Sequence, residues 1–322
     1  MAASPPVLPE PSGSVMHDLA AFRQAVRSGG PPKDGIPSID RPHFVAAEDA
    51  GLADEEIVIG LYLNGEARAY PQRILVWHEI VNDEVAGEAL SITYCPLTGT
   101  ALGFRRGDTE FGVSGRLVNS NLVMYDRATD SEWPQMLGGA IAGELAGRGL
   151  EEVRLFWTTW GAWRARYPET RVLSERTGHV RNYRHDPYGS YVPLRGYYRP
   201  DSGRLFPVMH DDSRLPPKAP VFGLRAPEGA VAITLEALSR EAVIDVALGE
   251  STYTIIHDPG LETGWAYRNS EGEAIDHDAL TFGATGIEGP GMAALEPVHG
   301  FEAMWFAWAA FYPDTELIGV AP

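Results

Sequence analysis

The chain has 322 residues, 44% of them hydrophobic, and its 44 acidic side chains outnumber its 26 basic ones, giving a net charge of −18. The hydrophobic content, with 8 Trp, 13 Tyr and 11 Phe, is typical of a folded globular protein and excludes a disordered one. So acidic a surface repels phosphate backbones and anionic lipid headgroups, and we therefore expect no nucleic-acid binding and no binding to a membrane surface.

No stretch of the chain approaches the roughly 18 consecutive apolar residues that a membrane-spanning helix requires, so we predict no membrane insertion. The first ten residues lack the basic flank and the apolar core of a signal peptide. As written, the sequence predicts a soluble cytoplasmic protein, and export with a trimmed signal is the alternative.

Short strands alternate with a few short helices along the chain. Strands are expected at 57–63, 67–70, 89–94, 101–105, 110–114 and 122–125, and helices at 72–80, 158–167 and 303–311. The pair Asn64-Gly65 between the first two strands indicates a tight hairpin, and Pro71 suits the start of the first helix. The pattern predicts an α+β fold, mostly of short antiparallel strands.

Two stretches of the chain resemble each other. The run at 160–173 shares two tryptophans, a tyrosine and a proline with the run at 305–318, and weaker matches continue upstream of both. We therefore predict two pseudo-repeated halves. The expected organisation is an N-terminal extension at 1–49, a first repeat at 50–175, an ordered and aromatic-rich connection at 176–218, and a supporting second repeat at 219–322.

Cys95 is the only cysteine, and it stands at the end of a predicted strand, directly before a proline. A single cysteine excludes an intramolecular disulfide and a four-cysteine zinc site. With His78 as a base, Cys95 could act as a thiolate nucleophile. Alternatively, His78 and Cys95 could bind copper, zinc or iron, with a third ligand from His185, His210 or His257. A buried structural role for both residues is the remaining interpretation.

Polar side chains elsewhere in the first repeat are candidate ligand-binding residues. Asn119 and Asn121 precede an apolar strand, and Asp126 and Arg127 end it. Amides in such a loop can bind a polar ligand or form Asx turns, and the acid–base pair can clamp a substrate or form a structural ion pair. In the connection, we expect His185 or Tyr188 to line a pocket near Cys95.

Several runs of residues carry a resemblance to a known family. They are 34–40 (DGIPSID), 65–71 (GEARAYP), 77–83 (WHEIVND), 93–99 (TYCPLTG), 111–115 (FGVSG), 119–127 (NSNLVMYDR) and 186–191 (DPYGSY). Together they resemble the DUF3179 family of prokaryotic proteins, over nearly the whole chain from about residue 34. The resemblance implies no assigned activity and no known catalytic residues.

The residues therefore leave two functional hypotheses. The first is an enzyme whose site, metal-assisted or thiol-based, lies around His78 and Cys95 in the first repeat. The second is a non-catalytic protein that binds a small molecule or serves as a scaffold, in which the same polar residues hold loops in place.

Overall fold

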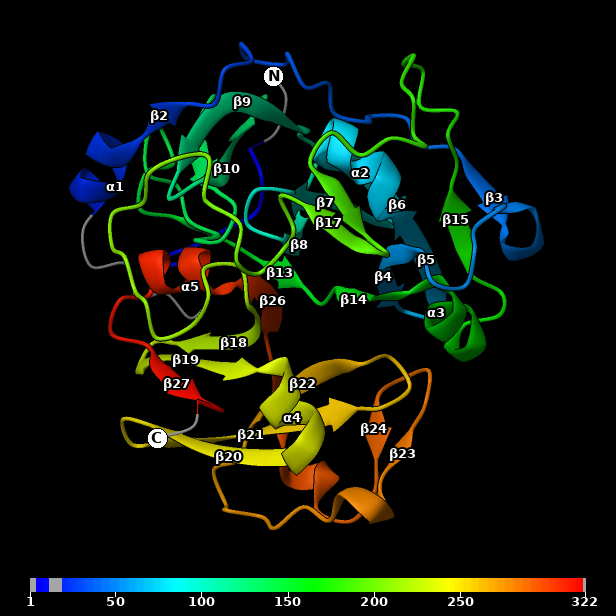
Figure 1. The fold of residues 1–322 in the computed structure, drawn as a ribbon, viewed down its shortest axis with the longest axis vertical. Helices are drawn as coiled ribbons and strands as arrows, with labels where there is room; N and C mark the ends of the chain where they lie inside the picture. Colours follow the sequence, from blue (N-terminus) through cyan, green and yellow to red (C-terminus); the bar gives the residue numbers. More distant parts are fainter. Residues whose placement is uncertain (1–3, 12–18, 321–322) are drawn as a thin grey trace.

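The computed structural model describes residues 4–11 and 19–320 (Figure 1). Within these residues, five α-helices of seven residues each accompany many short strands: α1 (Leu19–Ala25), α2 (Gln72–His78), α3 (Trp160–Arg166), α4 (Leu235–Glu241) and α5 (Trp305–Phe311). Helices this short are marginal alone, so packing against the sheets stabilises them. The α+β class with mostly antiparallel strands is confirmed. No described helix is long and apolar enough to cross a membrane.

Three sheets build the first unit, the upper part of Figure 1. Their strands are β2 (Arg27–Ser28), β3 (Phe44–Ala46), β4 (Ile57–Leu63), β5 (Glu66–Pro71), β6 (Ile80–Val85), β7 (Glu88–Cys95), β8 (Thr100–Arg105), β9 (Phe111–Val118), β10 (Asn121–Asp126), β11 (Glu132–Pro134), β13 (Glu152–Val153), β14 (Phe156–Thr159) and β15 (Arg171–Leu173). The sheet orders are β14-β4-β5-β15-β3, β13-β8-β7-β6 and β11-β10-β9-β2.

Two sheets build the second unit, below the first in Figure 1. Their strands are β18 (Pro220–Ala226), β19 (Gly229–Thr234), β20 (Val243–Leu248), β21 (Ser251–Asp258), β22 (Thr263–Arg268), β25 (Glu296–Val298), β26 (Gly300–Met304) and β27 (Glu316–Ile318). The orders are β26-β18-β19-β27 and β20-β21-β22-β25. Three short pairs complete the described strands: β1 (Val7–Leu8) with β12 (Gly149–Leu150), β16 (Gly189–Tyr191) with β17 (Leu194–Gly196), and β23 (Thr281–Phe282) with β24 (Ile287–Glu288).

The two units have the same strand order around their central hairpins. β4 and β5 lie between β14 and β15, as β18 and β19 lie between β26 and β27. In both units the last of these strands pairs in parallel, β15 with β5 and β27 with β19. A helix and an antiparallel meander follow each hairpin, and the second strand of each meander, β7 or β21, ends at Cys95 or Asp258.

A tryptophan of the last helix packs on a strand glycine in each unit. A methyl group on Gly60 would lie 2.2 Å from a ring carbon of Trp163, and one on Gly223 would lie 2.1 Å from Trp308. Each indole N–H donates to a threonine hydroxyl beyond the helix, at 3.0 Å for Trp163 and 2.9 Å for Trp308. The absence of a side chain at these glycines therefore lets the helix approach the sheet.

A buried ion pair joins the two units. Arg166 of α3 makes two hydrogen bonds to Asp258 at the end of β21, of 3.1 and 2.9 Å. The Asp258 side chain is fully buried, and Trp265 also donates to it at 3.2 Å. The carboxylate thus has charged and neutral donors on both of its oxygens.

The first helix that the sequence predicts, at 72–80, ends earlier in the structure. The sequence predicts a helix to residue 80, but α2 ends at His78 because Glu79 adopts a left-handed conformation with φ 58°. Ile80 and Val81 are β-branched and pair with β7, opposite Thr93 and Ile92. Sheet pairing therefore takes the place of a further helical turn.

The packing of Trp163 and Trp308 predicts that Gly60→Ala and Gly223→Ala each destabilise the protein by about 1–3 kcal/mol, because the new methyl group overlaps the indole. Urea denaturation followed by far-UV circular dichroism measures this change. Gly203→Ala is the matched control, since its added methyl group meets nothing within 4 Å. Midpoints equal to that of the parent for the first two variants would contradict the packing argument.

Candidate functional site

His78 is fully buried, and both of its ring nitrogens are occupied. Nδ1 lies 2.8 Å from the carbonyl oxygen of Pro37, and Nε2 lies 2.7 Å from the hydroxyl of Tyr183. A carbonyl only accepts, so Nδ1 carries the proton and Nε2 accepts from Tyr183. Burial lowers the pKa of His78 to about 4, which keeps the ring neutral at physiological pH. His78 therefore joins the segment around Pro37 to the connection.

Cys95 ends β7 and is 1% exposed. Its Sγ lies 3.8 Å from the carbonyl oxygen of Ser120. Burial, and then the nearby carboxyl of Glu79, raise the pKa of the thiol to about 11. The thiol is therefore protonated at neutral pH and is a weak nucleophile in this state. No hydrogen bond joins it to His78, whose partners are Pro37 and Tyr183.

Glu79, which the sequence did not single out as a site residue, is the acid beside Cys95. Its backbone carbonyl accepts from Tyr94 at 2.7 Å, which places it opposite the end of β7. The residue is 6% exposed, and its carboxyl has no hydrogen-bond partner among the described residues. Burial raises its pKa to about 8, so the acid is largely protonated at neutral pH. Its apolar neighbours in the sequence, Trp77, Ile80 and Val81, were the signal that could have identified it.

Asn119 and Asn121 are buried, and their side-chain amides are bonded to other segments of the chain. Asn119 donates to the carbonyl of Ala310 at 3.0 Å and accepts from the amide of Met209 at 2.8 Å. Asn121 donates to Gln135 at 2.9 Å and accepts from the amide of Met136 at 2.9 Å. These bonds use both ends of each amide, so the geometry favours a structural role for both residues.

Asp126 and Arg127 point to different partners. Asp126 is fully buried and accepts from Thr129 and from the indole of Trp133 at 3.0 Å, which closes the turn after β10. Arg127 is partly exposed, and its guanidinium lies 3.3 Å from the carboxylate of Asp34. The carboxylates of Asp40 and Glu110 also lie within ion-pair distance of it. The two residues therefore form neither an ion pair with each other nor a common clamp.

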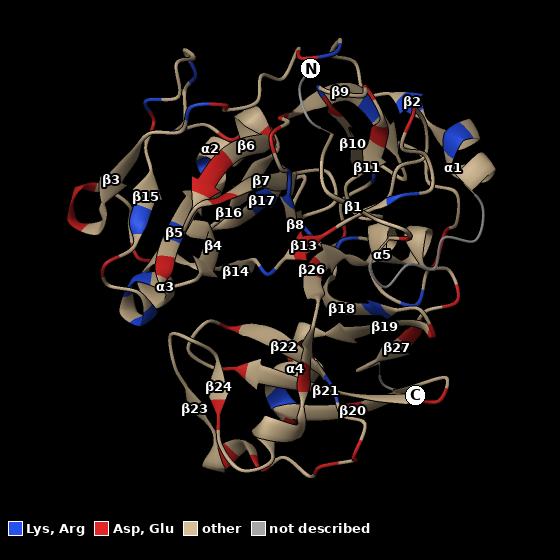
Figure 2. Cartoon of the chain, turned by 180° about the vertical axis from the view of Figure 1, so that it is seen from behind, with Lys and Arg blue, Asp and Glu red and all other residues tan. Residues whose placement is uncertain are grey.

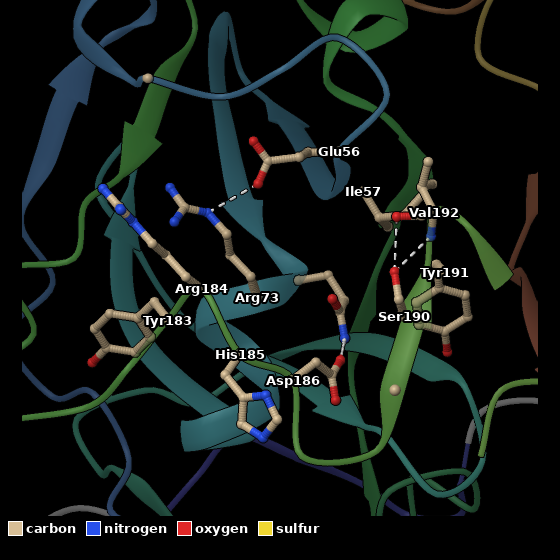
Figure 3. A pocket seen from close by; sticks show the side chains of 13 residues that line it. Glu56, Ile57, Arg73, Tyr183, Arg184, His185, Asp186, Ser190, Tyr191 and Val192 are labelled. Carbon is tan, nitrogen blue, oxygen red and sulfur yellow. Dashed lines mark hydrogen bonds and ion pairs between the residues drawn. The ribbon is translucent and has the colours of Figure 1, made fainter. Parts of the chain in front are cut away.

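A pocket of about 500 Å³, here called the α2 pocket, lies beside the first turn of α2 (Figure 3). The side chains that bear on its chemistry are Glu56, Gln72, Arg73, Arg184, His185 and Asp186. Figure 3 shows Arg73 turned towards Glu56 on one side of the pocket, with Asp186 on the other. His185 thus lines a pocket to which neither His78 nor Cys95 contributes.

A hydrogen-bonded network forms one side of the α2 pocket. Asp186 accepts from Gln72 at 3.0 Å, from the Tyr198 hydroxyl at 2.8 Å and from the Tyr188 amide at 2.8 Å. Gln72 also donates to the buried hydroxyl of Tyr94 at 3.1 Å. The connection is therefore bonded to α2 and β7 through buried polar groups.

Tyr188 packs between the Glu79–Cys95 region and the neighbouring tyrosines of the connection. Its ring lies 5.9 Å from that of Tyr197 and 6.4 Å from that of Tyr198. Burial, and then the carboxyl of Glu79, raise the pKa of its phenol. The side chain covers the Glu79–Cys95 region and does not line the α2 pocket.

The metal hypothesis has no preformed site in the described part of the chain. Within residues 4–11 and 19–320, no group of three or more His, Cys, Asp or Glu side chains could hold a metal ion. His78, Cys95 and His185 are not brought together, so no copper, zinc or iron site is formed by that set.

Comparison with known proteins gives one match. The family model described as "Protein of unknown function (DUF3179)" matches residues 33–315. No curated protein and no solved structure matches the chain.

The position of Glu79 predicts a pH-dependent stability that Glu79→Gln removes. Because the folded state raises this pKa to about 8, its contribution to stability is complete below about pH 4.5 and is lost as the pH rises to 8. The loss is at most about 1.4 kcal/mol per pH unit. Urea denaturation of parent and variant at pH 5, 6, 7 and 8 measures the difference. Glu84→Gln, an exposed acid on β6, should keep the parental slope, and an unchanged slope in Glu79→Gln would refute the assignment.

Burial of Cys95 predicts slow reaction with a thiol reagent. We expect the native protein to react with dithiobis-nitrobenzoate only as fast as it opens, and the urea-unfolded protein to release one equivalent of thiolate at once. Absorbance at the thiolate band measures both rates. Rapid stoichiometric reaction of the native protein would instead favour the nucleophile hypothesis.

Proposed function

We propose that this chain, which belongs to the DUF3179 family, binds a small organic anion in the α2 pocket. In this proposal the binding is non-catalytic. The observation that carries this proposal is an imbalance of partners among the charged side chains of the pocket. The acids have partners and two of the basic groups have none in the described part of the chain, so an anion is the ligand that would complete the site.

The acids of the pocket are already engaged. Glu56 lies 3.1 Å from Arg73, which also pairs with Glu175. Asp186 accepts its three hydrogen bonds from Gln72 and from the connection. A cationic ligand would have to displace these donors, which makes cation binding unfavourable.

Arg184 and His185 are the unengaged groups. Both side chains are exposed, and neither has a hydrogen-bond or ion-pair partner among the described residues. A guanidinium presents a fork of donors that matches a carboxylate or phosphate, and an anion could accept from it without breaking an existing bond. The volume of about 500 Å³ lies in the range of small-molecule pockets.

The net charge bears on selectivity. Figure 2 shows Asp and Glu distributed over both units, and the chain carries a net charge of −18. Long-range electrostatics therefore repel an anion, and affinity must come from direct contacts with Arg184 and His185. Such a site would bind only anions that make those contacts well.

The enzyme hypothesis around Cys95 and His78 has less support. The thiol is buried with a raised pKa, and both nitrogens of the histidine are bonded to other groups. Glu79 is the remaining ionisable side chain of that region, and it has no basic partner among the described residues. Binding therefore fits the geometry better than thiol chemistry or metal-assisted chemistry.

We also propose that the two units arose by internal duplication, and that the α2 pocket is formed by the first repeat together with the connection. The common strand order and the equivalent tryptophan–glycine contacts support this proposal. In the second unit, Ala242 has the left-handed backbone of Glu79, and Asp258 takes the strand-end place of Cys95. The second repeat would then support the first.

The proposal predicts that citrate, used as a probe anion, binds saturably by isothermal titration calorimetry and that Arg184→Ala weakens it about tenfold or more. The loss of hydrogen bonds between a charged donor and a charged acceptor accounts for this factor. Arg181→Ala is the matched control, because this partly exposed arginine lies three residues away and does not line the pocket.

Two results would overturn the proposal. One is the absence of saturable binding of citrate, succinate and inorganic phosphate to the parent. The other is an equal loss of citrate affinity in Arg181→Ala and Arg184→Ala, which would indicate a general effect of net charge.

A further inference from the structure

A second pocket lies where the two units and the connection meet. This junction pocket has a volume of about 220 Å³. Its walls include Trp157 of β14, Tyr191 and Leu194 of the β16–β17 hairpin, Tyr198, Met304 at the end of β26, and Glu302. Figure 1 shows β14 of the first unit and β26 of the second unit in the middle of the molecule, where the two units face each other.

The aromatic side chains of the junction pocket are held in fixed positions. Tyr191 stacks on Tyr198, with ring centroids 4.0 Å apart and an interplanar angle of 18°. Trp157 meets Tyr191 edge-on, with centroids 5.3 Å apart and an angle of 74°. The hydroxyl of Tyr198 is bonded to Asp186, which fixes the pair from behind. Walls of this kind suit a flat aromatic body, which can stack or pack edge-to-face.

Two charged side chains line the junction pocket, and they differ in the hydrogen bonds that they can still make. Lys218 has used its three ammonium protons on the carbonyls of Tyr197 and Gly203 and the hydroxyl of Ser202, at 2.6 to 2.8 Å. Glu302 accepts from Thr263 on one oxygen, and its other oxygen has no partner among the described residues. The hydrogen-bonding group that these two side chains leave for a ligand is therefore an acceptor, the second oxygen of Glu302.

The charge near Glu302 decides between a cationic and a neutral donor. Burial raises the pKa of the Glu302 carboxyl, and the nearby guanidinium of Arg154 opposes this rise and favours the carboxylate. Arg154 itself donates to the carbonyls of Gly264 and Gly300. An ammonium group placed at Glu302 would meet this cation, whereas an O–H or an aromatic N–H would not be repelled.

We propose that the junction pocket binds a planar, neutral aromatic molecule that carries one hydrogen-bond donor, as phenols and indoles do. The aromatic body lies against Trp157 and Tyr191, beside the thioether of Met304, and the donor bonds to Glu302. Apolar cavities of about 150 Å³ bind benzene, so a pocket of this volume accommodates one or two fused rings. This inference is independent of anion binding in the α2 pocket.

The test uses 5-fluoroindole as the probe, titrated into the full chain and followed by ¹⁹F NMR. We expect saturable binding, and an affinity about tenfold lower for 1-methyl-5-fluoroindole, which has the same rings but no donor. The same affinity for both compounds would overturn the role of Glu302. No saturable binding of 5-fluoroindole or of 4-fluorophenol would overturn the proposal as a whole.

Two variants locate the binding. Leu194→Trp, at a half-exposed position, fills the pocket and should abolish binding of 5-fluoroindole. Arg184→Ala alters only the α2 pocket and should leave it unchanged, so failure of one proposal is distinguishable from failure of the other. Unchanged binding in a folded Leu194→Trp variant would place the probe elsewhere and overturn the assignment. A crystal soaked with 5-bromoindole gives an independent readout, because bromine scattering outside the junction pocket would have the same consequence.

Discussion

The carboxylate of Asp186 is the interaction on which both pockets depend. It accepts from Gln72 at the start of α2, from the amide of Tyr188 and from the hydroxyl of Tyr198. Through Gln72 it holds the connection over the first unit, which forms a wall of the α2 pocket. Through Tyr198 it supports the stacked ring of Tyr191, which forms a wall of the junction pocket. One partly buried carboxylate with three hydrogen-bond donors thus supports both pockets.

Burial, rather than residue type, determines the chemistry available in the first unit. The imidazole of His78 and the thiol of Cys95 are reactive groups when exposed, but here burial keeps the ring neutral and the thiol protonated. The same effect acts on Glu79, whose carboxyl is held largely in its neutral form. In the α2 pocket, the groups that remain available to a ligand are the exposed side chains of Arg184 and His185, in the connection.

Local signals in the sequence were sufficient for much of the fold. The Asn64-Gly65 pair identifies the β4–β5 hairpin, because the turn needs positive φ at both residues, and β4 spans the expected 57–63. The end of α2 was misplaced, since pairing of β6 with β7 overrides the helical pattern at Glu79. The site depends on contacts such as Gln72 with Asp186, which are 114 residues apart and leave no local pattern. Those contacts follow only from tertiary packing.

The ion pair between Arg166 and Asp258 also determines how the molecule comes apart. Separating the units would leave the fully buried Asp258 carboxylate without its guanidinium, a change that typically costs about 3–5 kcal/mol. It would also withdraw Arg154 from the carbonyls of Gly264 and Gly300 in the second unit. We therefore expect neither unit to be stable alone, despite their matching strand orders. We expect the chain to unfold as one cooperative body, and proteolytic cleavage within the connection to release no stable half.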